Sequence, residues 1–346
     1  MIRVLIADDS PTARALLRAI LDAQPDLRVV GEAVNGNEAV ASTEALRPDV
    51  VLMDVHMPEL DGIEATREIM ARRATPIVVV SSVSQRDVDL SLQATEAGAL
   101  VALPKPEGPS SPRFREQSDQ IVSMVRAMAG VKVVRRWSLE KRAPQHRVGT
   151  SQARDVRVVG IAASTGGPPA LRALLSELPS DFPAPIVIVQ HIARDFTAGF
   201  AHWLGDGSPL PVRLAQRGEP LRPAHVYVAP DDVHLRVGQD LSVNFSSAPP
   251  LNGFRPSATH LFESIAAAHG ARGLGVVLTG MGSDGADGLA ALRAAGGYVI
   301  GQDEGSSVVF GMAQEALRRG GVDELLPMER IASRIVTLVG QGASHV

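Results

Sequence analysis

Three polar side chains in the second half of the sequence have the types that nucleophilic catalysis requires. Ser164 lies in "VRVVGIAASTGGPPALRALL", His191 follows "PIVIVQ", and Asp284 lies in "LTGMGSDGADG". A serine hydroxyl is a poor nucleophile unless an adjacent base activates it. Histidine can take its proton near neutral pH, and a carboxylate can fix the imidazole tautomer and stabilise the imidazolium. The three residues therefore form a candidate Ser-His-Asp site.

The loop that follows Ser164 does not match the commonest glycine-rich motifs. "GIAASTGG" differs from G-x-S-x-G, lacks the lysine of a nucleotide P-loop, and lacks the G-x-G-x-x-G spacing. Plainer interpretations stay open: Ser164 as a helix N-cap, His191 as a structural histidine, and Asp284 as a turn residue. Several glycines let the backbone approach a substrate and expose N–H groups that could hold an oxyanion: Gly166, Gly167, Gly280, Gly282 and Gly285.

A second set of polar residues lies in the first third of the chain. Each follows a short apolar run: Asp8, Asp9, Asp54, Ser81 and Lys105. Three carboxylates at one edge would repel one another unless a divalent cation lay among them, and oxygen ligands favour Mg²⁺. The lysine and the serine hydroxyl suit a phosphoryl group. The alternative is that these aspartates only cap helices.

Both sets of residues need a parallel sheet to bring them together. In the first third, predicted strands at 4–7, 29–34, 50–53, 77–80 and 100–103 alternate with helices at 12–22, 37–46, 62–71 and 86–97. From residue 156, strands at 156–162, 185–190, 274–278 and 298–300 alternate with helices at 170–178, 196–204, 287–294 and 314–319. The short extended pieces in 212–245 suggest an inserted antiparallel hairpin region. The fold class is therefore α/β, with two doubly wound, mainly parallel-sheet domains whose sites lie at the carboxyl ends of strands.

The middle of the chain separates these two patterns. Residues 114–129 have a helical pattern that suits the last helix of the first domain, and residues 106–155 carry ten Lys and Arg against five Asp and Glu. We predict a first domain at 1–129, a basic flexible linker at 130–155 and a second domain at 156–346. A nucleic-acid-binding arm is the alternative for the basic segment, but a helix-turn-helix pattern and interleaved aromatic residues are missing.

Composition narrows the function classes. The 346 residues include no cysteine, which excludes disulfides, thiolate zinc sites and a cysteine nucleophile. The sequence also lacks a run approaching the ~20 apolar residues of a membrane span, and its N-terminus does not read as a signal peptide. The net charge of −4 gives no strong basic excess, so nucleic acid is not an expected partner. Without a long apolar run, membrane insertion is not expected either.

The first domain resembles the receiver domains of bacterial response regulators, in "LIADDSPTARALL", "DVVLMDVHMPELDGIEATREI", "PIVVVSS" and "LPKP". The resemblance implies that Asp54 accepts a phosphoryl group from a histidine kinase. Asp9, Asp54 and the His56 carbonyl would bind Mg²⁺, with Asp8 helping through water. Ser81 and Lys105 would contact the phosphoryl oxygens. Ala102 occupies a position where receivers often carry an aromatic switch residue, so any switch would depend on Ser81 and the backbone.

The second domain resembles the catalytic domain of chemotaxis-type protein-glutamate methylesterases, the CheB family. "GIAASTGGPPAL", "VIVQHI", "RPSATHLFESIA" and "GVVLTGMGSDGADGL" carry the resemblance. It implies Ser164 as nucleophile, His191 as base and Asp284 as the residue that orients it, with main-chain N–H groups near Thr165 and Met281 lining an oxyanion hole. No cofactor is expected for the hydrolysis. Ser283 stands where the family often has asparagine, which is not a triad position.

Together the two resemblances imply a phosphorylation-regulated hydrolase of glutamate methyl esters on chemoreceptors, which could also deamidate receptor glutamines. They imply that the unphosphorylated receiver covers the catalytic face. A cytoplasmic location with recruitment to chemoreceptor arrays follows, and a monomer is the default. The hypothesis from another class is a phosphorylation-driven binding module without catalysis, which a methanol-release assay distinguishes from an enzyme.

Overall fold

The computed structural model describes residues 1–131, 133 and 153–340. The chain divides into two compact units, Met1–His146 and Arg147–Val346. The division falls within the basic segment predicted as a linker at 130–155, most of which lies outside the described residues. The linker and the predicted limits at 129 and 156 therefore stay predictions, and each unit is considered by itself.

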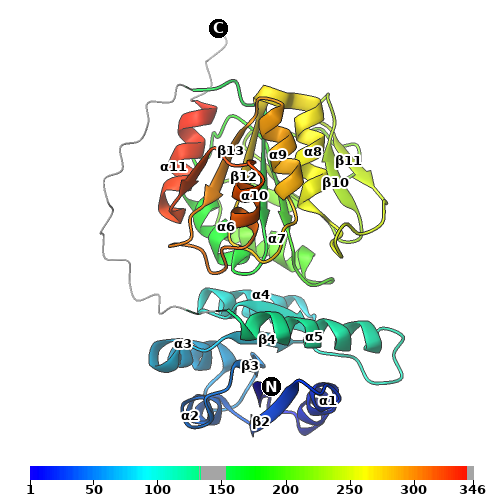
Figure 1. Ribbon diagram of the computed structural model, residues 1–346, viewed down its shortest axis with the longest axis vertical. Coiled ribbons are helices and arrows are strands. Elements are labelled where there is room, and N and C mark those ends of the chain that lie inside the picture. Colours follow the sequence, from blue (N-terminus) through cyan, green and yellow to red (C-terminus); the bar gives the residue numbers. More distant parts are fainter. Residues whose placement is uncertain (132, 134–152, 341–346) are drawn as a thin grey trace. The chain divides into compact units, whose positions relative to one another are not determined.

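The first unit is a parallel five-stranded sheet in the order β2-β1-β3-β4-β5. Its helices α1 and α5 cover one face, and α2, α3 and α4 cover the other (Figure 1). The elements are β1 (Ile2–Ala7), α1 (Pro11–Asp22), β2 (Leu27–Ala33), α2 (Gly36–Leu46), β3 (Val50–Met53), α3 (Gly62–Arg73), β4 (Ile77–Ser81), α4 (Gln85–Glu96), β5 (Val101–Pro104) and α5 (Phe114–Ala129). The predicted alternation of strands and helices is confirmed.

Polar N-cap residues begin several helices in this unit. The Ser10 side chain accepts a hydrogen bond from the Ala13 N–H, and Pro11 occupies the first turn of α1. The Asp61 side chain accepts hydrogen bonds from the N–H groups of the first turn of α3. Because these residues supply the caps, Asp8 and Asp54, at the ends of β1 and β3, are not the N-caps of the helices that follow.

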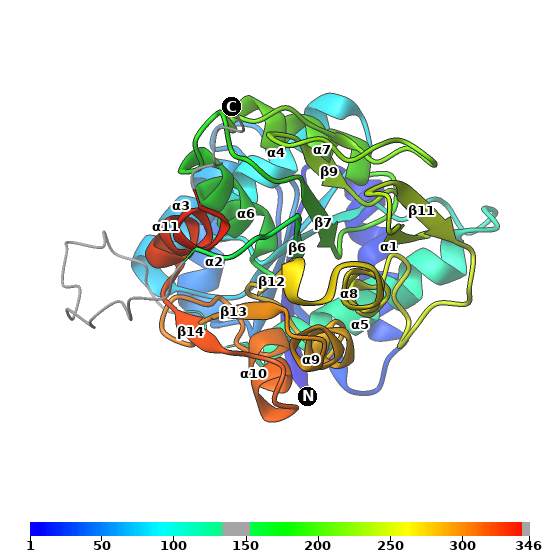
Figure 2. The ribbon, with the colours of Figure 1, turned by 90° about the horizontal axis from the view of Figure 1, so that it is seen from above.

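The second unit contains a seven-stranded sheet in the order β14-β13-β12-β6-β7-β9-β8, and its strand pairs are parallel. Figure 2 shows α6, α7 and α11 on one face of this sheet and α8, α9 and α10 on the other. The elements are β6 (Val158–Ala163), α6 (Gly167–Ser176), β7 (Ile186–Gln190), α7 (Thr197–Asp206), β8 (Val212–Leu214), β9 (Val226–Val228), β10 (His234–Val237), β11 (Val243–Ser246), α8 (Ala258–His269), a 3₁₀ turn (Gly270–Arg272), β12 (Gly273–Val277), α9 (Ala286–Ala294), β13 (Tyr298–Gln302), α10 (Met312–Arg318), β14 (Glu324–Leu326) and α11 (Met328–Val339).

The antiparallel region is smaller than the sequence suggested. Among the named strands of the described residues, β10 and β11 alone pair antiparallel, whereas β8 and β9 join the main sheet as parallel strands beside β7. Short β-branched runs have the same pattern in either setting, so the sequence alone did not distinguish them. Helices α8 and α11 and strand β14 were not predicted.

The core of the second unit forms where α8 and α9 pack on the sheet. Phe262 and Ile265 of α8 and Leu289 and Leu292 of α9 are fully buried, together with strand residues such as Val277. In the described part of the chain, no helix combines the length and the apolar character needed to cross a membrane.

Candidate functional site

The parallel register places the three candidate catalytic residues at one edge of the second sheet. Central strand β6 pairs with β7 on one side and with β12 on the other. The His191 N–H donates to the Ala163 carbonyl at 3.0 Å, and the Ser164 N–H donates to the Thr279 carbonyl at 3.0 Å. Ser164 thus lies between the end of β7 and the loop that leads from β12 to Asp284, as expected for a doubly wound sheet.

Ser164 is not the N-cap of the helix that follows it. The N-cap of α6 is Gly166, whose φ of 74° is readily adopted by glycine. The backbone of the opposite loop approaches Ser164 closely, because a Cβ added at Gly280 would lie 2.8 Å from the Ser164 Cβ. A side chain at residue 280 would crowd the candidate nucleophile.

Gln190 connects the backbones of the candidate nucleophile and base, a role that the sequence did not reveal. Its Nε2 donates to the carbonyl of Ser164 at 2.9 Å and to the carbonyl of His191 at 2.8 Å. Gln190 is buried, and a Cβ at Gly167 would lie 2.1 Å from its Oε1. Glycine at residue 167 therefore leaves the space that this amide occupies.

His191 and Asp284 form a direct pair. The His191 Nε2 lies 2.8 Å from the Asp284 Oδ2, and their side chains are 7% and 0% exposed. The other ring nitrogen, Nδ1, is buried and has no hydrogen-bond partner in the described chain. The imidazole is thus held by the carboxylate through one nitrogen, and its second nitrogen is available to accept a proton.

The Asp284 carboxylate lies at the N-terminus of α8, where several donors converge on it. Oδ2 accepts from the Ala258 N–H at 2.7 Å, and Oδ1 accepts from the Ser257 hydroxyl at 2.6 Å. The Thr259 N–H and hydroxyl donate to Oδ1 at 3.2 and 3.0 Å. Although burial works to raise it, the hydrogen bonds from His191, Ser257 and Ala258 lower the pKa of Asp284 from 3.8 to about 2. A carboxylate held in this way is more than a turn residue.

Ser257 and Thr259 are thus residues that sequence reasoning missed as part of the site. A serine after Arg-Pro and before the apolar pattern "ATHLFESIAAAHG" is the available signal for a helix start. What the sequence could not show is that this helix start faces Asp284, which lies 25 or more residues away along the chain.

The two main-chain donors expected from the sequence lie in the loops around Ser164. Among the described residues, no hydrogen-bond acceptor is found for the N–H of Thr165 or the N–H of Met281. The Thr165 carbonyl accepts from the Thr279 hydroxyl at 2.9 Å, which ties the two loops together. Two free N–H groups in loops beside a serine have the character of an oxyanion hole.

The acidic residues of the first unit converge at the carboxyl edge of its sheet. Carboxylate oxygens of Asp8, Asp9 and Asp54 lie within 4.8 Å of one another, with Asp8 and Asp54 buried and Asp9 exposed. The Lys105 Nζ lies 2.8 Å from Oδ2 of both Asp8 and Asp54. Burial raises the pKa of Asp54, and contact with Lys105 offsets only part of that effect. For Lys105, hydrogen bonds to Asp54 and Asp8 outweigh burial and raise its pKa.

Two further features of this edge suit a divalent cation and a phosphoryl group. The Ser81 hydroxyl is buried at the end of β4 and has no hydrogen-bond partner within the described chain. The acid cluster supplies the oxygen donors that Mg²⁺ prefers. The His56 side chain does not take part, because its Nε2 lies 2.5 Å from Asp87 Oδ1. Ala102 is buried within β5.

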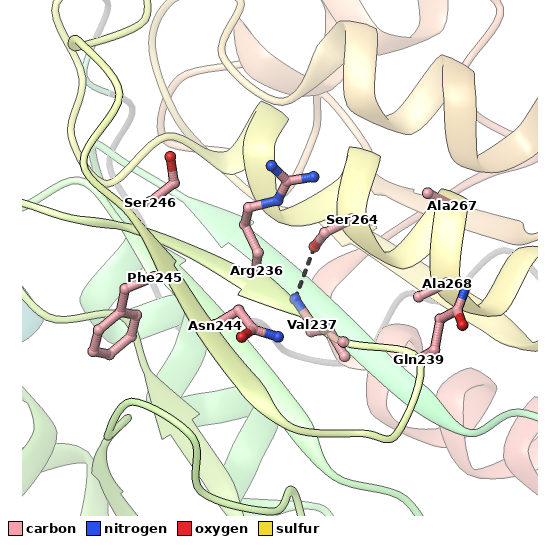
Figure 3. A pocket seen from close by; sticks show the side chains of 10 residues that line it. Arg236, Val237, Gln239, Asn244, Phe245, Ser246, Ser264, Ala267 and Ala268 are labelled. Carbon is pink, nitrogen blue, oxygen red and sulfur yellow. Dashed lines mark hydrogen bonds between the residues drawn. The ribbon is translucent and has the colours of Figure 1, made fainter.

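A separate pocket of about 450 Å³ lies between the β10–β11 hairpin and α8. Figure 3 shows the side chains that line it, including Arg236, Asn244 and Phe245, with Ser264 accepting a hydrogen bond from the Val237 N–H. None of the candidate catalytic residues lines this pocket.

Comparison with known proteins agrees with both units. Residues 159–335 match the family model for CheB methylesterase, and residues 4–112 match that for the response regulator receiver domain. The chain is 50% identical to protein-glutamate methylesterase/protein-glutamine glutaminase 4 of Myxococcus xanthus, with 97% of this chain and 96% of that protein covered. It is equally 50% identical to protein-glutamate methylesterase/protein-glutamine glutaminase 3 of Anaeromyxobacter dehalogenans, covering 97% of this chain and 98% of that protein.

A solved structure agrees with the catalytic unit. The crystal structure of the CheB methylesterase catalytic domain of Thermotoga maritima is 37% identical, covers 52% of this chain and 97% of that chain, and has a TM-score of 0.51. The seven-stranded parallel sheet, the His191–Asp284 pair at its edge and these likenesses over nearly the full length lead to one assignment: the chain belongs to the CheB methylesterase family.

Proposed function

We propose that the protein hydrolyses glutamate γ-methyl esters on chemoreceptors, with Ser164 as nucleophile, His191 as general base and Asp284 as the residue that orients the base. The activity is the one named for its full-length relatives. The observation that carries the site assignment is the buried pair of His191 and Asp284. The Nδ1 atom of His191 has no partner among the described residues, and His191 follows β7, the strand that pairs with β6 just before Ser164.

The state of Asp284 fixes the state of the imidazole. With a pKa of about 2, Asp284 is ionised at neutral pH and can only accept hydrogen bonds. The His191 Nε2 must therefore carry the proton that it donates to Asp284, which leaves Nδ1 as the basic nitrogen. Nδ1 takes the Ser164 hydroxyl proton as Oγ attacks the ester carbonyl, a step in which a Ser–Nδ1 hydrogen bond forms once substrate is bound.

The remaining steps use the same groups. The carbonyl oxygen becomes an oxyanion held by the Thr165 and Met281 N–H groups, each contributing roughly 2.7–4 kcal/mol of transition-state stabilisation. The imidazolium returns its proton to the leaving methoxide, and methanol departs from the acyl-enzyme. Water then attacks the acyl carbon while His191 accepts one of its protons, and the Ser164 oxygen leaves with that proton. The product is a glutamic acid side chain, which ionises to the carboxylate by releasing a proton to solvent.

Deamidation of receptor glutamines follows from the same machinery. A glutamine side chain has the length of a glutamate methyl ester, and its carbonyl reaches the same oxyanion donors. The leaving group is then ammonia, which takes its proton from the His191 imidazolium. The second half of the relatives' names, protein-glutamine glutaminase, supports this activity.

Phosphorylation of Asp54 by a histidine kinase regulates the esterase in this proposal. Asp9, Asp54 and the His56 carbonyl would hold Mg²⁺, with Asp8 helping through water, and the ion would supply positive charge that offsets the three clustered carboxylates. Ser81 and Lys105 then contact the phosphoryl oxygens. The unpartnered, buried Ser81 hydroxyl supports this arrangement, because such a group gains a partner when the phosphoryl group is present.

The site of action follows from the substrate. Methylated glutamates of chemoreceptors lie on their cytoplasmic helices, so a cytoplasmic protein recruited to chemoreceptor arrays is proposed. The partners are then the methylated receptor and the histidine kinase that phosphorylates Asp54.

Methanol release from methylated receptor membranes tests the catalytic assignment. Ser164→Ala is expected to lower the rate by roughly 10⁴-fold or more, since the nucleophile is lost. Ser176→Ala is the matched control, because this serine on α6 is exposed and its hydroxyl donates to the Ala173 carbonyl, away from the candidate site. Equal rates for Ser164→Ala and the unaltered protein would mean that the site is not the catalytic one, and no methanol from either would favour a binding module.

A further inference from the structure

Phe254 packs flat against the candidate catalytic base. Its ring centroid lies 3.9 Å from that of His191, and the two ring planes differ by only 9°. Phe254 is partly exposed, whereas His191 lies beneath it with a side chain only 7% exposed. We propose that Phe254 is a positioning residue for catalysis, which fixes the plane of the His191 imidazole and stabilises the imidazolium that forms during the reaction.

The backbone around Phe254 is built to hold this ring in place. Leu251 and Phe254 exchange two backbone hydrogen bonds, Leu251 N–H to Phe254 carbonyl at 3.1 Å and Phe254 N–H to Leu251 carbonyl at 2.9 Å. Between them, Asn252 and Gly253 have φ values of 51° and 86°. An Asn-Gly pair with two positive φ values forms a tight turn of type I′, in which neither residue is strained. The hydrogen-bonded turn therefore fixes the backbone from which the Phe254 side chain extends toward His191.

The same segment continues into the donors that hold Asp284. Ser257 and Thr259 follow Phe254 within five residues and donate to the Asp284 carboxylate. Ser257 is in turn held by His234, whose Nδ1 accepts from the Ser257 N–H at 3.2 Å while its Nε2 lies 3.2 Å from the Pro249 carbonyl. Residues 251–259 thus fix both members of the pair, His191 by the ring and Asp284 by hydrogen bonds.

The stacked ring affects the reaction in two physical ways. The negative face of an aromatic ring attracts a cation, so the interaction strengthens when His191 becomes an imidazolium in the transition state. The ring also blocks rotation of the imidazole and keeps water from one of its faces. Both effects act on the base rather than on the substrate, so the inference predicts a change in kcat and not in KM. This inference rests on the proposed role of His191.

Replacing Phe254 by leucine and by tyrosine separates the stacked ring from simple bulk. We expect Phe254→Leu to lower kcat for methanol release by roughly 5- to 30-fold with KM unchanged. Phe254→Tyr keeps the ring and is expected to retain kcat within about twofold of the unaltered protein. The matched control is Phe245→Leu, a partly buried phenylalanine of the same unit that packs against Arg217 and lines the pocket of Figure 3. It is expected to leave both kinetic constants unchanged.

A second variant changes the backbone of the Leu251–Phe254 turn and leaves the Phe254 ring in place. A side chain at Gly253 has open space around it, but its φ of 86° disfavours every β-branched residue. Gly253→Val should therefore lower kcat while Phe254 remains, whereas Gly218→Val, at an equally open glycine with a φ of 77°, should not. Thermal unfolding of each variant checks that the protein is folded.

The inference is overturned if Phe254→Leu keeps the kcat of the unaltered protein, or if its loss appears in KM alone. It is also overturned if Phe254→Tyr loses as much kcat as Phe254→Leu. The variant His191→Ala separates failure of this inference from failure of the proposed site. If His191→Ala releases methanol at the rate of the unaltered protein, the site assignment itself is wrong. If His191→Ala loses activity while Phe254→Leu keeps it, only the role of Phe254 is rejected.

Discussion

Each unit buries an aspartate at the carboxyl edge of a parallel sheet, but the two carboxylates are treated in opposite ways. Asp54 is 4% exposed and has its pKa raised, first by burial, with Lys105 offsetting part of the effect. Asp284 is 1% exposed, yet hydrogen bonds outweigh burial and lower its pKa to about 2. Similar burial therefore accompanies opposite shifts of the pKa, because more donors contact Asp284 and because the charge of Asp8 lies beside Asp54.

The opposite pKa shifts reflect two kinds of site. Around Asp54 negative charge is not fully compensated, whereas the charge of Asp284 is compensated by nearby donors. Around Asp54, the neighbouring Asp8 and Asp9 add negative charge, and the Ser81 hydroxyl has no partner among the described residues. Around Asp284, main-chain N–H groups and hydroxyls from the start of α8 are all directed at the carboxylate. The contrast matches the proposed roles: the carboxylate proposed to accept a phosphoryl group has few donors, whereas the one proposed to orient a base is surrounded by them.

The sharpest test of this contrast replaces each aspartate by asparagine. Asp284→Asn should lower kcat for methanol release by roughly 10⁴-fold, since the amide no longer fixes the proton on the His191 Nε2. Asp54→Asn should keep the unstimulated rate and lose stimulation by acetyl phosphate. Methanol release with and without this phosphodonor measures both effects. Similar behaviour of the two variants would contradict the division of roles.

The second test uses the pH dependence of stability. Because the pKa of Asp284 falls from 3.8 to about 2 on folding, its ionised form contributes about 2 kcal/mol, fully present above roughly pH 4 and lost as the pH falls toward about 2. Asp54 has the opposite sign, because a raised pKa means that its charged form disfavours the folded state above its ordinary pKa.

Scanning calorimetry of the full chain at about pH 7 and about pH 3 checks both signs. Asp284→Asn should unfold at a lower temperature at neutral pH and lose part of the acid sensitivity of the unaltered protein. Asp54→Asn should unfold at a higher temperature at neutral pH. If both substitutions shift the transition in the same direction, the donors around Asp284 do not have the effect assigned to them.

A smaller effect is expected when single donors to Asp284 are removed. Ser257→Ala deletes the hydroxyl that lies 2.6 Å from Oδ1 and should cost about 1 kcal/mol of unfolding free energy. Thr259→Val should cost about twice as much, since the Thr259 hydroxyl both donates to Asp284 and accepts from the Gly285 N–H at 2.9 Å. Thr337→Val, at an exposed helical threonine, is the control. Equal losses at residues 257, 259 and 337, measured by urea unfolding, would speak against a special role for these donors.

The smallest expected effect concerns Lys105 and Mg²⁺. Lys105→Met removes the cation that lies 2.8 Å from Asp8 and Asp54, so the acid cluster should bind Mg²⁺ more tightly, by roughly three- to tenfold. Calorimetric titration with MgCl₂ alone measures this change. Arg86→Met, which removes an exposed cation, serves as the control. Weaker Mg²⁺ binding in Lys105→Met would show that the lysine helps to hold the ion instead of competing with it.

The sequence was enough to place the candidate site residues at the carboxyl ends of the strands in both sheets, because these polar residues directly follow buried apolar runs. Asp54 follows Val50–Met53, and His191 follows Ile186–Gln190, so strand direction alone brings their loops to the site. The pairing of His191 with Asp284 agrees with the sequence-based expectation, whereas the catalytic roles of these residues stay proposals.

What surrounds Asp284 and His191 could not be predicted in the same way. The donors from Ser257 and Thr259 depend on helix α8, which was not predicted and whose start is brought to Asp284 only by the packing of α8 on α9 and the sheet. Phe254 reaches His191 through a turn whose sequence, Asn-Gly, predicts a bend but not what the bend faces. Strands β8 and β9 were misjudged because pairing partners far along the chain decide their direction.

The Gln190 amide has a mechanical consequence for turnover. One NH₂ group donates to the carbonyls of both Ser164 and His191, so the ends of β6 and β7 are linked beyond their last ladder hydrogen bond. The Gln190 amide therefore couples the backbone at Ser164 to the backbone at His191. For the proposed roles of these two residues, this link favours a constant relative position of the nucleophile and the base, on which well-oriented catalysis depends.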